Sequence, residues 1–254
     1  MKEITSVHNP QVQRLRELQK AKGRREAGYF LAESAKMVRE AIALGLCRTL
    51  IVDESRRETL AELIGAAQAA GCEVLLVTAA VMQAISEQKT PQSVCCTVRI
   101  PEEPERLSGS LIVAMDGVQD PGNVGTILRT ADAFDCDGVF LVSACADPYS
   151  PKTARATMGA VFRRDVYQCT ADELCALLQK SNLPLYGTAL RNDTVSLRDA
   201  ELSRAAVAIG SEGRGLSAEI LSKCEKTIKI PMSPRCESLN AAVAASVVLW
   251  EMYR

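Results

Sequence analysis

The sequence has few of the side chains that enzymes most often use for proton transfer and metal binding. Its 254 residues include one histidine, His8, close to the N-terminus. A Ser-His-Asp triad or a histidine-rich metal centre would have to include that residue, so we expect neither, and we expect no bound metal.

Paired cysteines and long hydrophobic runs are also missing. Ten cysteines are scattered along the chain, and none forms a C-x-x-C pair. Without a signal-peptide pattern, this distribution predicts reduced thiols in a cytoplasmic protein. No run of about 18 apolar residues occurs, so we expect no contact with a membrane.

Charge of one sign is not in excess over the whole chain, but it is unevenly distributed. The net charge is −1, from 30 Lys and Arg against 31 Asp and Glu. Residues 1–48 alone contain ten basic and five acidic side chains. This local excess predicts that an anionic partner binds at the N-terminal end.

Two series of alternating strand and helix patterns lie on either side of a stretch rich in proline and charge. In residues 1–100 we predict strands at 28–32, 49–52, 74–77 and 94–100, and helices at 12–25, 33–44 and 58–70. Residues 101–110 are typical of a linker. In residues 111–254 we predict strands at 111–115, 138–142, 185–188, 206–209 and 226–230, and helices at 123–134, 152–158, 172–180 and 239–253. The pattern predicts two α/β domains, the second with a parallel sheet that binds ligands beyond the carboxyl ends of its strands.

The first of three candidate ligand loops contains a Pro-Gly-Asn turn, in which Asn123 can cap the following helix. Arg129 can reach back over Gly125 and Thr126 toward the helix N-terminus, where backbone N–H groups favour an anion. The alternative is an ordinary capped helix in which Arg129 pairs with Asp132.

The second loop, residues 209–216, has three glycines in six residues after a predicted strand. Glycines let the backbone approach a ligand closely, and Glu212 offers a hydrogen-bond acceptor. The spacing is not G-x-G-x-x-G, and no G-x-x-x-x-G-K-[ST] occurs, which argues against a dinucleotide or nucleotide-phosphate site. The alternative is a tight turn before a helix that begins near Ser217.

The third loop, residues 230–240, leads into the last helix, which Ser238 or Asn240 can cap. That helix is apolar almost all round, so it must be buried on most sides. It packs inside one subunit or completes a subunit interface.

In their order and spacing, the three loops resemble the motifs of the SpoU (TrmH-type) branch of the SPOUT RNA methyltransferases. The matching segments, within residues 110–254, are Asn123…Gly125…Arg129-Thr130, Gly210-Ser211-Glu212-Gly213-Arg214-Gly215-Leu216 and Ile230-Pro231-Met232…Glu237-Ser238-Leu239-Asn240. Residues 1–100 are similar to the L30e-like substrate-binding domain that often precedes that domain, through His8-Asn9-Pro10, the basic helix and Phe30-Leu31-Ala32-Glu33. Pro234 and Ser34 each stand where the family often has glycine.

The resemblance implies a homodimeric RNA 2′-O-ribose methyltransferase that uses S-adenosylmethionine and carries a C-terminal trefoil knot. By position it implies that Arg129, Asn123, Glu212, Ser238 and Asn240 form the catalytic site. It implies that Gly210, Ile230 and Leu239 bind the cofactor, and we add Thr188, Ala189, Ile209, Gly213 and Met232 as neighbouring candidates. The separate N-terminal domain favours ribosomal RNA as the substrate. A tRNA methyltransferase and a non-catalytic RNA-binding module are the alternatives.

Histidine is absent from the second half, and arginine stays protonated in the usual pH range. We therefore expect Arg129 to bind an RNA phosphate and to stabilise charge on the 2′-oxygen, instead of acting as a base. The candidate phosphate contacts in the first domain are Arg14, Arg16, Lys20, Lys22, Arg24 and Arg25, with a solvated helix face as the alternative. Tyr29 could stack on a base, and Phe30 is expected in the core.

Overall fold

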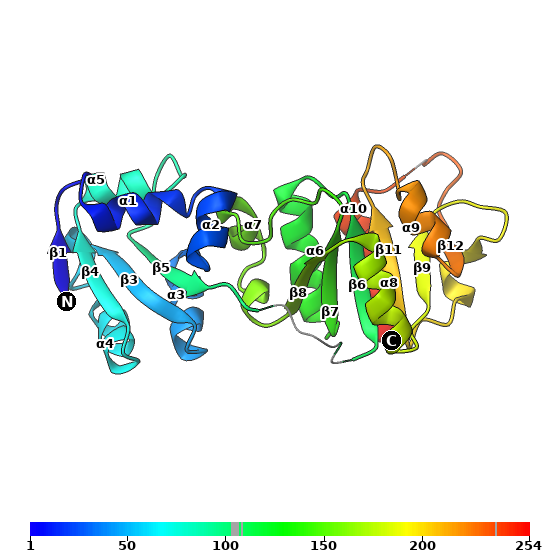
Figure 1. The fold of residues 1–254 in the computed structure, drawn as a ribbon, viewed down its shortest axis with the longest axis horizontal. Helices are drawn as coiled ribbons and strands as arrows, with labels where there is room; N and C mark the ends of the chain where they lie inside the picture. Colours follow the sequence, from blue (N-terminus) through cyan, green and yellow to red (C-terminus); the bar gives the residue numbers. More distant parts are fainter. Residues whose placement is uncertain (103–106, 108, 237) are drawn as a thin grey trace. The chain divides into compact units, whose positions relative to one another are not determined.

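The computed structural model describes residues 1–102, 107, 109–236 and 238–254. Half of the predicted linker, residues 103–106 and 108, lies outside these residues, as does Glu237. The chain forms two compact units, the first made of Met1–Pro101 and Tyr149–Phe162 and the second of Glu102–Pro148 and Arg163–Arg254 (Figure 1). Within the described ranges, no helix is long and apolar enough to cross a membrane.

The first unit is built on a mixed five-stranded sheet in the order β1-β4-β3-β5-β2. Its strands are β1 (Lys2–Ile4), β2 (Tyr29–Glu33), β3 (Cys47–Asp53), β4 (Glu73–Val77) and β5 (Val94–Arg99), and its helices are α1 (Pro10–Glu17), α2 (Ala21–Ala27), α3 (Ala35–Ala43), α4 (Ala61–Ala69), α5 (Ala79–Ile85) and α7 (Pro151–Ala156). Successive residues of a strand face opposite sides of the sheet, so each side has its own apolar core. One core packs against α3 and α4, and the other packs against α1 and α5.

The segment Tyr149–Phe162 belongs to the first unit, although the sequence pattern predicts one continuous domain over residues 111–254. The rings of Tyr149 and Phe162 lie 5.2 and 6.1 Å from the ring of Phe30, which is buried as predicted. Arg155 on α7 donates to the buried carboxylate of Glu33 at 3.1 Å. The periodicity of a helix indicates that one of its faces is buried, but it does not indicate which sheet that face packs against. The sequence pattern therefore could not predict that this segment belongs to the first unit.

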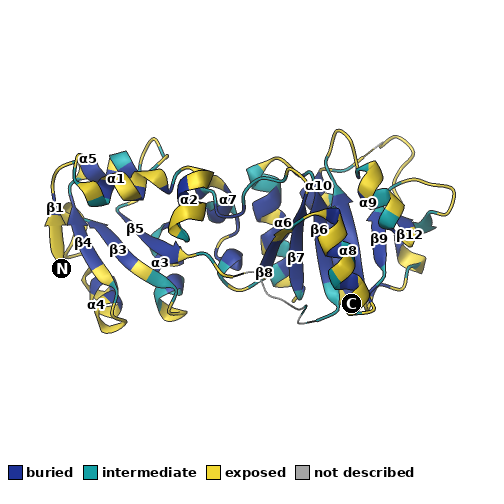
Figure 2. Ribbon diagram, in the orientation of Figure 1, coloured by how far each residue is buried: buried dark blue, intermediate teal, exposed yellow. Residues whose placement is uncertain are grey.

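The second unit has a seven-stranded, wholly parallel sheet in the order β10-β12-β9-β11-β6-β7-β8. Its strands are β6 (Leu111–Asp116), β7 (Gly138–Val142), β8 (Asp165–Cys169), β9 (Leu185–Thr188), β10 (Val195–Ser196), β11 (Ala205–Gly210) and β12 (Lys226–Lys229), and its helices are α6 (Pro121–Ala133), α8 (Ala171–Lys180), α9 (Ala218–Lys223) and α10 (Ala241–Tyr253). Helices α8 and α9 cover one face of the sheet, and α6 and α10 cover the other. The strands are consequently buried while the outer faces of the helices are exposed (Figure 2).

Three local predictions differ from the structure. The single helix predicted over 12–25 is two helices, α1 and α2, separated by residues 18–20. Strands β1, β8 and β10 were not predicted. Helix α6 begins at Pro121, and its N-cap is Asp120, whose side chain accepts a hydrogen bond from the Asn123 backbone. The cap predicted for Asn123 is therefore wrong, and its side chain is available for other contacts.

Candidate active site

The candidate site lies at the carboxyl ends of neighbouring parallel strands. Strands β12, β9, β11 and β6 are adjacent in the sheet, so the loops that follow them leave from the same edge. A cavity of about 550 Å³ opens among the loops after β9, β11 and β12. Its volume lies within the range of about 300–1,000 Å³ that is typical of small-molecule sites.

Seven of the eight predicted cofactor positions line this cavity, namely Thr188, Ala189, Ile209, Gly210, Ile230, Met232 and Leu239. The eighth, Gly213, is not among the lining residues. The structure adds lining residues that the sequence argument missed, including Leu190, Ser211, Lys229, Cys236 and Ala244. Ser211 and Cys236 belong to the second and third ligand loops, whereas Leu190, Lys229 and Ala244 lie outside the three loops, and only the fold brings them to the cavity.

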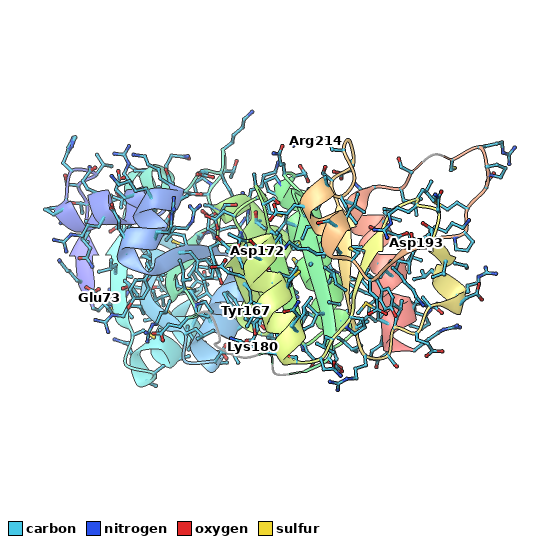
Figure 3. The ribbon with its side chains drawn as sticks, turned by 45° about the vertical axis from the view of Figure 1, so that its right-hand side comes forward. Glu73, Tyr167, Asp172, Lys180, Asp193 and Arg214 are labelled. Atoms are coloured by element: carbon cyan, nitrogen blue, oxygen red, sulfur yellow. The ribbon has the colours of Figure 1, made fainter. Side chains whose placement is uncertain are left out.

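The backbone of the glycine-rich loop folds back on itself at the rim of the cavity. Ser211 and Gly215 form a bridge in which the Gly215 N–H donates to the Ser211 carbonyl at 2.9 Å and the Ser211 N–H donates back at 3.2 Å. A Cβ atom at Gly210 would lie 2.2 Å from the Gly215 carbonyl carbon, so only glycine fits. Arg214, labelled in Figure 3, is exposed in the same loop.

Three predicted catalytic side chains meet in one hydrogen-bonded cluster. The Asn123 side-chain amide donates to Oε1 of Glu212, and the Asn240 amide donates to the same oxygen at 3.3 Å. The Asn240 amide also donates to Oδ1 of Asn123 at 3.1 Å. The cluster therefore joins the first, second and third ligand loops, and it leaves Oε2 of Glu212 without a partner among the described residues.

Asn240 also caps the last helix, which confirms one of the two caps predicted for that helix. Its Oδ1 accepts from the backbone N–H groups of Ala242 at 3.0 Å and Val243 at 3.3 Å, so it is the N-cap of α10. The cap fixes the side chain, which leaves the amide nitrogen aimed at Asn123 and Glu212. Ser238, the other candidate cap, lines the cavity instead.

Arg129 is exposed on α6 and forms no hydrogen bond or ion pair with the described side chains of this cluster. Among the described residues it has no hydrogen-bond or ion-pair partner. The carboxylate of Asp132 is held by Arg163 and Arg164, so the alternative pair between Arg129 and Asp132 is not formed. The guanidinium of Arg129 is therefore available to an external anion.

Asp116, at the end of β6, binds the N-cap residue of the helix that follows the glycine-rich loop, which the sequence pattern did not predict. It is buried, and its two carboxylate oxygens accept from the Ser143 hydroxyl at 2.8 Å and from the Ser217 N–H at 2.6 Å. Ser217 is the N-cap of α9, which directly follows the glycine-rich loop. The available signal was a carboxylate at the end of an apolar strand of the buried type, because a buried carboxylate must find hydrogen-bond partners.

The cysteine that follows α9, Cys224, has no sign of reactivity. Burial raises the pKa of its thiol to about 11. A thiol with such a pKa stays protonated and is a poor nucleophile. In the described part of the chain, no cluster of three or more His, Cys, Asp and Glu side chains could hold a metal ion.

The basic N-terminal helices place five of the six predicted phosphate contacts on the surface. Arg14, Arg16, Lys20, Lys22 and Arg25 are exposed. Lys20 and Lys22 form surface ion pairs with Glu17 at 3.2 Å and Glu26 at 3.7 Å, which contribute little and break easily.

Arg24 is the exception, and its predicted phosphate contact is wrong. The side chain is 3% exposed and donates to the carbonyl oxygens of Leu18 at 2.8 Å and Gln19 at 2.7 Å. It thus satisfies the backbone where α1 ends and α2 begins, and it is inaccessible to a nucleic acid.

Comparison with known proteins identifies the family. Residues 110–250 match the SpoU rRNA Methylase family, and residues 9–96 match the MRM3-like substrate binding domain. The chain belongs to the SpoU rRNA methylase family. The 23S rRNA (guanosine(2553)-2′-O)-methyltransferase RlmP of Bacillus subtilis (strain 168) is 31% identical, and the alignment covers 99% of each chain.

Solved structures of this family share both units. An AdoMet-bound rRNA methyltransferase from Sinorhizobium meliloti is 33% identical, with a TM-score of 0.87 over 98% of this chain and 96% of that one. The SpoU methyltransferase AviRb from Streptomyces viridochromogenes, in complex with AdoMet, is 27% identical with a TM-score of 0.87 over 97% and 98% of the two chains. The two-domain α/β fold predicted from the sequence is thereby confirmed.

Proposed function

We propose that this chain transfers a methyl group from S-adenosylmethionine to a ribose 2′-hydroxyl of ribosomal RNA. The observation that carries the proposal is the cluster of Asn123, Glu212 and Asn240 beside the cavity, with a free guanidinium on the same helix as Asn123. The relatives named as rRNA methyltransferases that span the whole chain support ribosomal RNA as the substrate.

The cavity suits an adenosyl cofactor. Its apolar wall includes Ile209, Ile230 and Leu239, and the backbone of the glycine-rich loop comes close enough to exclude a side chain at Gly210. Exposed backbone N–H and C=O groups can recognise the adenine edge and the amino-acid part of the cofactor. When bound, S-adenosylmethionine supplies an activated methyl group on a sulfonium centre.

The protein must orient a weak nucleophile and ease the loss of its proton. In the proposed site, Arg129 binds the adjacent RNA phosphate and donates a hydrogen bond to the 2′-oxygen as negative charge develops. Asn123 and Glu212 orient the reacting group, and Ser238 and Asn240 line the ribose position. Holding the hydroxyl in line with the methyl group supplies much of the acceleration.

Substitution of Arg129 tests this assignment. We expect Arg129→Ala to retain S-adenosylmethionine binding by isothermal titration calorimetry and to lose at least about 100-fold in single-turnover methylation of ribosomal RNA fragments. If Arg129→Ala also lost S-adenosylmethionine binding, the role of Arg129 would be to maintain the fold of the site. Unchanged methylation by this variant would refute the proposed catalytic function of Arg129. A wild-type protein that binds RNA but no S-adenosylmethionine would favour the non-catalytic alternative.

The exposed basic residues of α1 and α2 are the proposed RNA contacts of the first unit. Arg14→Gln, Arg16→Gln and Arg25→Gln together should weaken RNA binding and reduce the dependence of log Kd on log salt by about 2–3, because fewer counterions are released. Arg24 is excluded from this set because it is buried. The same affinity and salt slope as the wild type would place the RNA elsewhere.

We also propose a homodimer formed through α10. Val243, Val247, Trp250 and Tyr253 are at least 37% exposed along the outer face of this helix. These four residues are spaced three or four positions apart along the helix, so their side chains form one apolar stripe. Trp250→Glu should yield monomers by analytical ultracentrifugation, whereas a monomeric wild type at micromolar concentration contradicts the proposal.

The trefoil knot and the cytoplasmic location belong to the same proposal. The close superposition on SpoU structures supports a knotted path for the third ligand loop and α10. All ten cysteines are free thiols, as in proteins of a reducing compartment.

A further inference from the structure

Arg129 has one acidic neighbour within reach on its own helix. The residues three and four positions away along α6 are Gly125, Thr126, Asp132 and Ala133. Side chains at such spacing are neighbours on the helix surface, and an arginine and an aspartate there normally attract each other. An exposed Arg129 next to Asp132 therefore requires an explanation.

The carboxylate of Asp132 is fully occupied by two other arginines. Arg163 donates to Oδ2 from Nε at 2.9 Å and from Nη2 at 2.7 Å. Arg164 donates to Oδ1 from Nε at 2.8 Å, so each carboxylate oxygen has a charged donor. The Asp132 side chain is 15% exposed, and solvent therefore screens these pairs only in part.

Arg164 is itself fixed at the end of α6. Its Nη1 donates to the Cys136 carbonyl and its Nη2 donates to Oδ1 of Asp135, both at 3.2 Å. The two basic residues immediately precede β8, so the pair of guanidiniums arrives at Asp132 from outside the helix. The two guanidinium groups of Arg163 and Arg164 therefore occupy both oxygens of the Asp132 carboxylate.

We propose that Arg163 and Arg164 are positioning residues for the methyl transfer, because they occupy Asp132 and so keep Arg129 free for the RNA phosphate. The inference rests on the proposed function of Arg129. A carboxylate that already accepts three charge-assisted hydrogen bonds has little attraction left for a third cation. Without the two arginines, the same carboxylate is open and one turn of helix away from the guanidinium that the reaction needs.

The test is a rescue experiment on the full-length protein. We expect Arg163→Gln with Arg164→Gln to lower single-turnover methylation of a ribosomal RNA fragment by about fivefold, the effect of one well-placed ion pair near the surface. Adding Asp132→Asn to this double variant should restore the rate to within about twofold of the wild type. Arg163→Lys is the conservative control, and it should retain most of the rate because its ammonium group still occupies Asp132.

A purely structural role gives the opposite pattern. If the cluster only anchors α6, Asp132→Asn alone lowers the rate, and adding it to the double variant leaves the rate low. Wild-type rates in the double variant, or no rescue by Asp132→Asn, overturns the proposal. Thermal melting and titration with S-adenosylmethionine show that each variant folds and binds the cofactor.

A direct readout separates this proposal from the proposed function. In NMR spectra of arginine side chains, the Nε–H signal of Arg129 should shift and sharpen in the double variant, because Arg129 then pairs with Asp132. In the triple variant, which also carries Asp132→Asn, the signal should return to its wild-type position and line width. If Arg129→Ala is inactive while the double variant is fully active, only the positioning inference fails. If Arg129→Ala is fully active, the proposed function of Arg129 fails first.

Discussion

Adding one methyl group at Gly210 should displace the glycine-rich loop at the rim of the cavity without changing any charge. The Cβ of Gly210→Ala would lie 2.2 Å from the Gly215 carbonyl carbon and 2.4 Å from the Leu216 nitrogen. Contacts of at least 3.0 Å require the loop to move by about 0.8 Å. The obstacle is backbone, which cannot rotate away as a flexible side chain would.

This displacement reaches the cluster of Asn123, Glu212 and Asn240 because Glu212 lies in the same loop. Overpacking against backbone costs about 1–3 kcal/mol of stability. A misplacement of about 1 Å can lower turnover by about 100-fold. We therefore expect Gly210→Ala to weaken S-adenosylmethionine binding at least tenfold by isothermal titration calorimetry and to lower single-turnover methylation by about 100-fold.

Gly213→Ala is the matched control from the same loop. A Cβ atom there meets no other heavy atom within 4 Å, and the residue does not line the cavity. It should bind the cofactor and methylate RNA within about twofold of the wild type. Equal binding and turnover in the two variants would refute the argument that the backbone at Gly210 shapes the site.

Three further predictions concern stability and are measured by urea denaturation. Ser34→Gly should stabilise the protein by about 1 kcal/mol, because Ser34 has a φ of 117°, where non-glycine residues are strained. The Ser34 hydroxyl caps α3 by accepting a hydrogen bond from the Met37 N–H, so no gain would mean that this hydrogen bond outweighs the strain. Arg155→Met should destabilise it by about 3 kcal/mol, because it leaves the buried Glu33 carboxylate without its cation; a change below 1 kcal/mol would show that solvent reaches Glu33. Asp116→Ala should cost about 2–3 kcal/mol, because two donors lose their acceptor, whereas an unchanged midpoint would show that water replaces the carboxylate.

The sequence predicted the sheet of the second unit and the meeting of its loops for one physical reason. Strands such as β6, β9 and β11 are short apolar runs between turn residues, and parallel strands place their carboxyl ends at one edge. Asn123, Glu212 and Asn240 were expected together on the strength of a family resemblance. The hydrogen bonds that join them are visible only in the structure.

The errors in prediction share a cause, which is tertiary context. Arginine is rarely buried, and Arg24 is buried only because the chain turns sharply between α1 and α2 and exposes carbonyl groups that need a donor. Strand β8 contains charged and polar residues because it is the edge strand of its sheet. Asp120 and Asn123 are equally good caps by residue type, and the start of the helix at Pro121 decides between them.

The segment Tyr149–Phe162 affects the order in which the protein folds during synthesis. The first unit lacks part of its apolar core until residue 162 has left the ribosome, because Tyr149, Ala154 and Val161 cover the sheet beside Phe30. The first 101 residues therefore emerge as a sheet with one incompletely covered face, and strands β6 and β7 are made before that face is complete. Folding that usually proceeds domain by domain from the N-terminus must here wait for the middle of the chain. A stop codon placed after residue 101 would thus release an incomplete first unit, and recombination at that boundary could not transfer the unit whole to another protein.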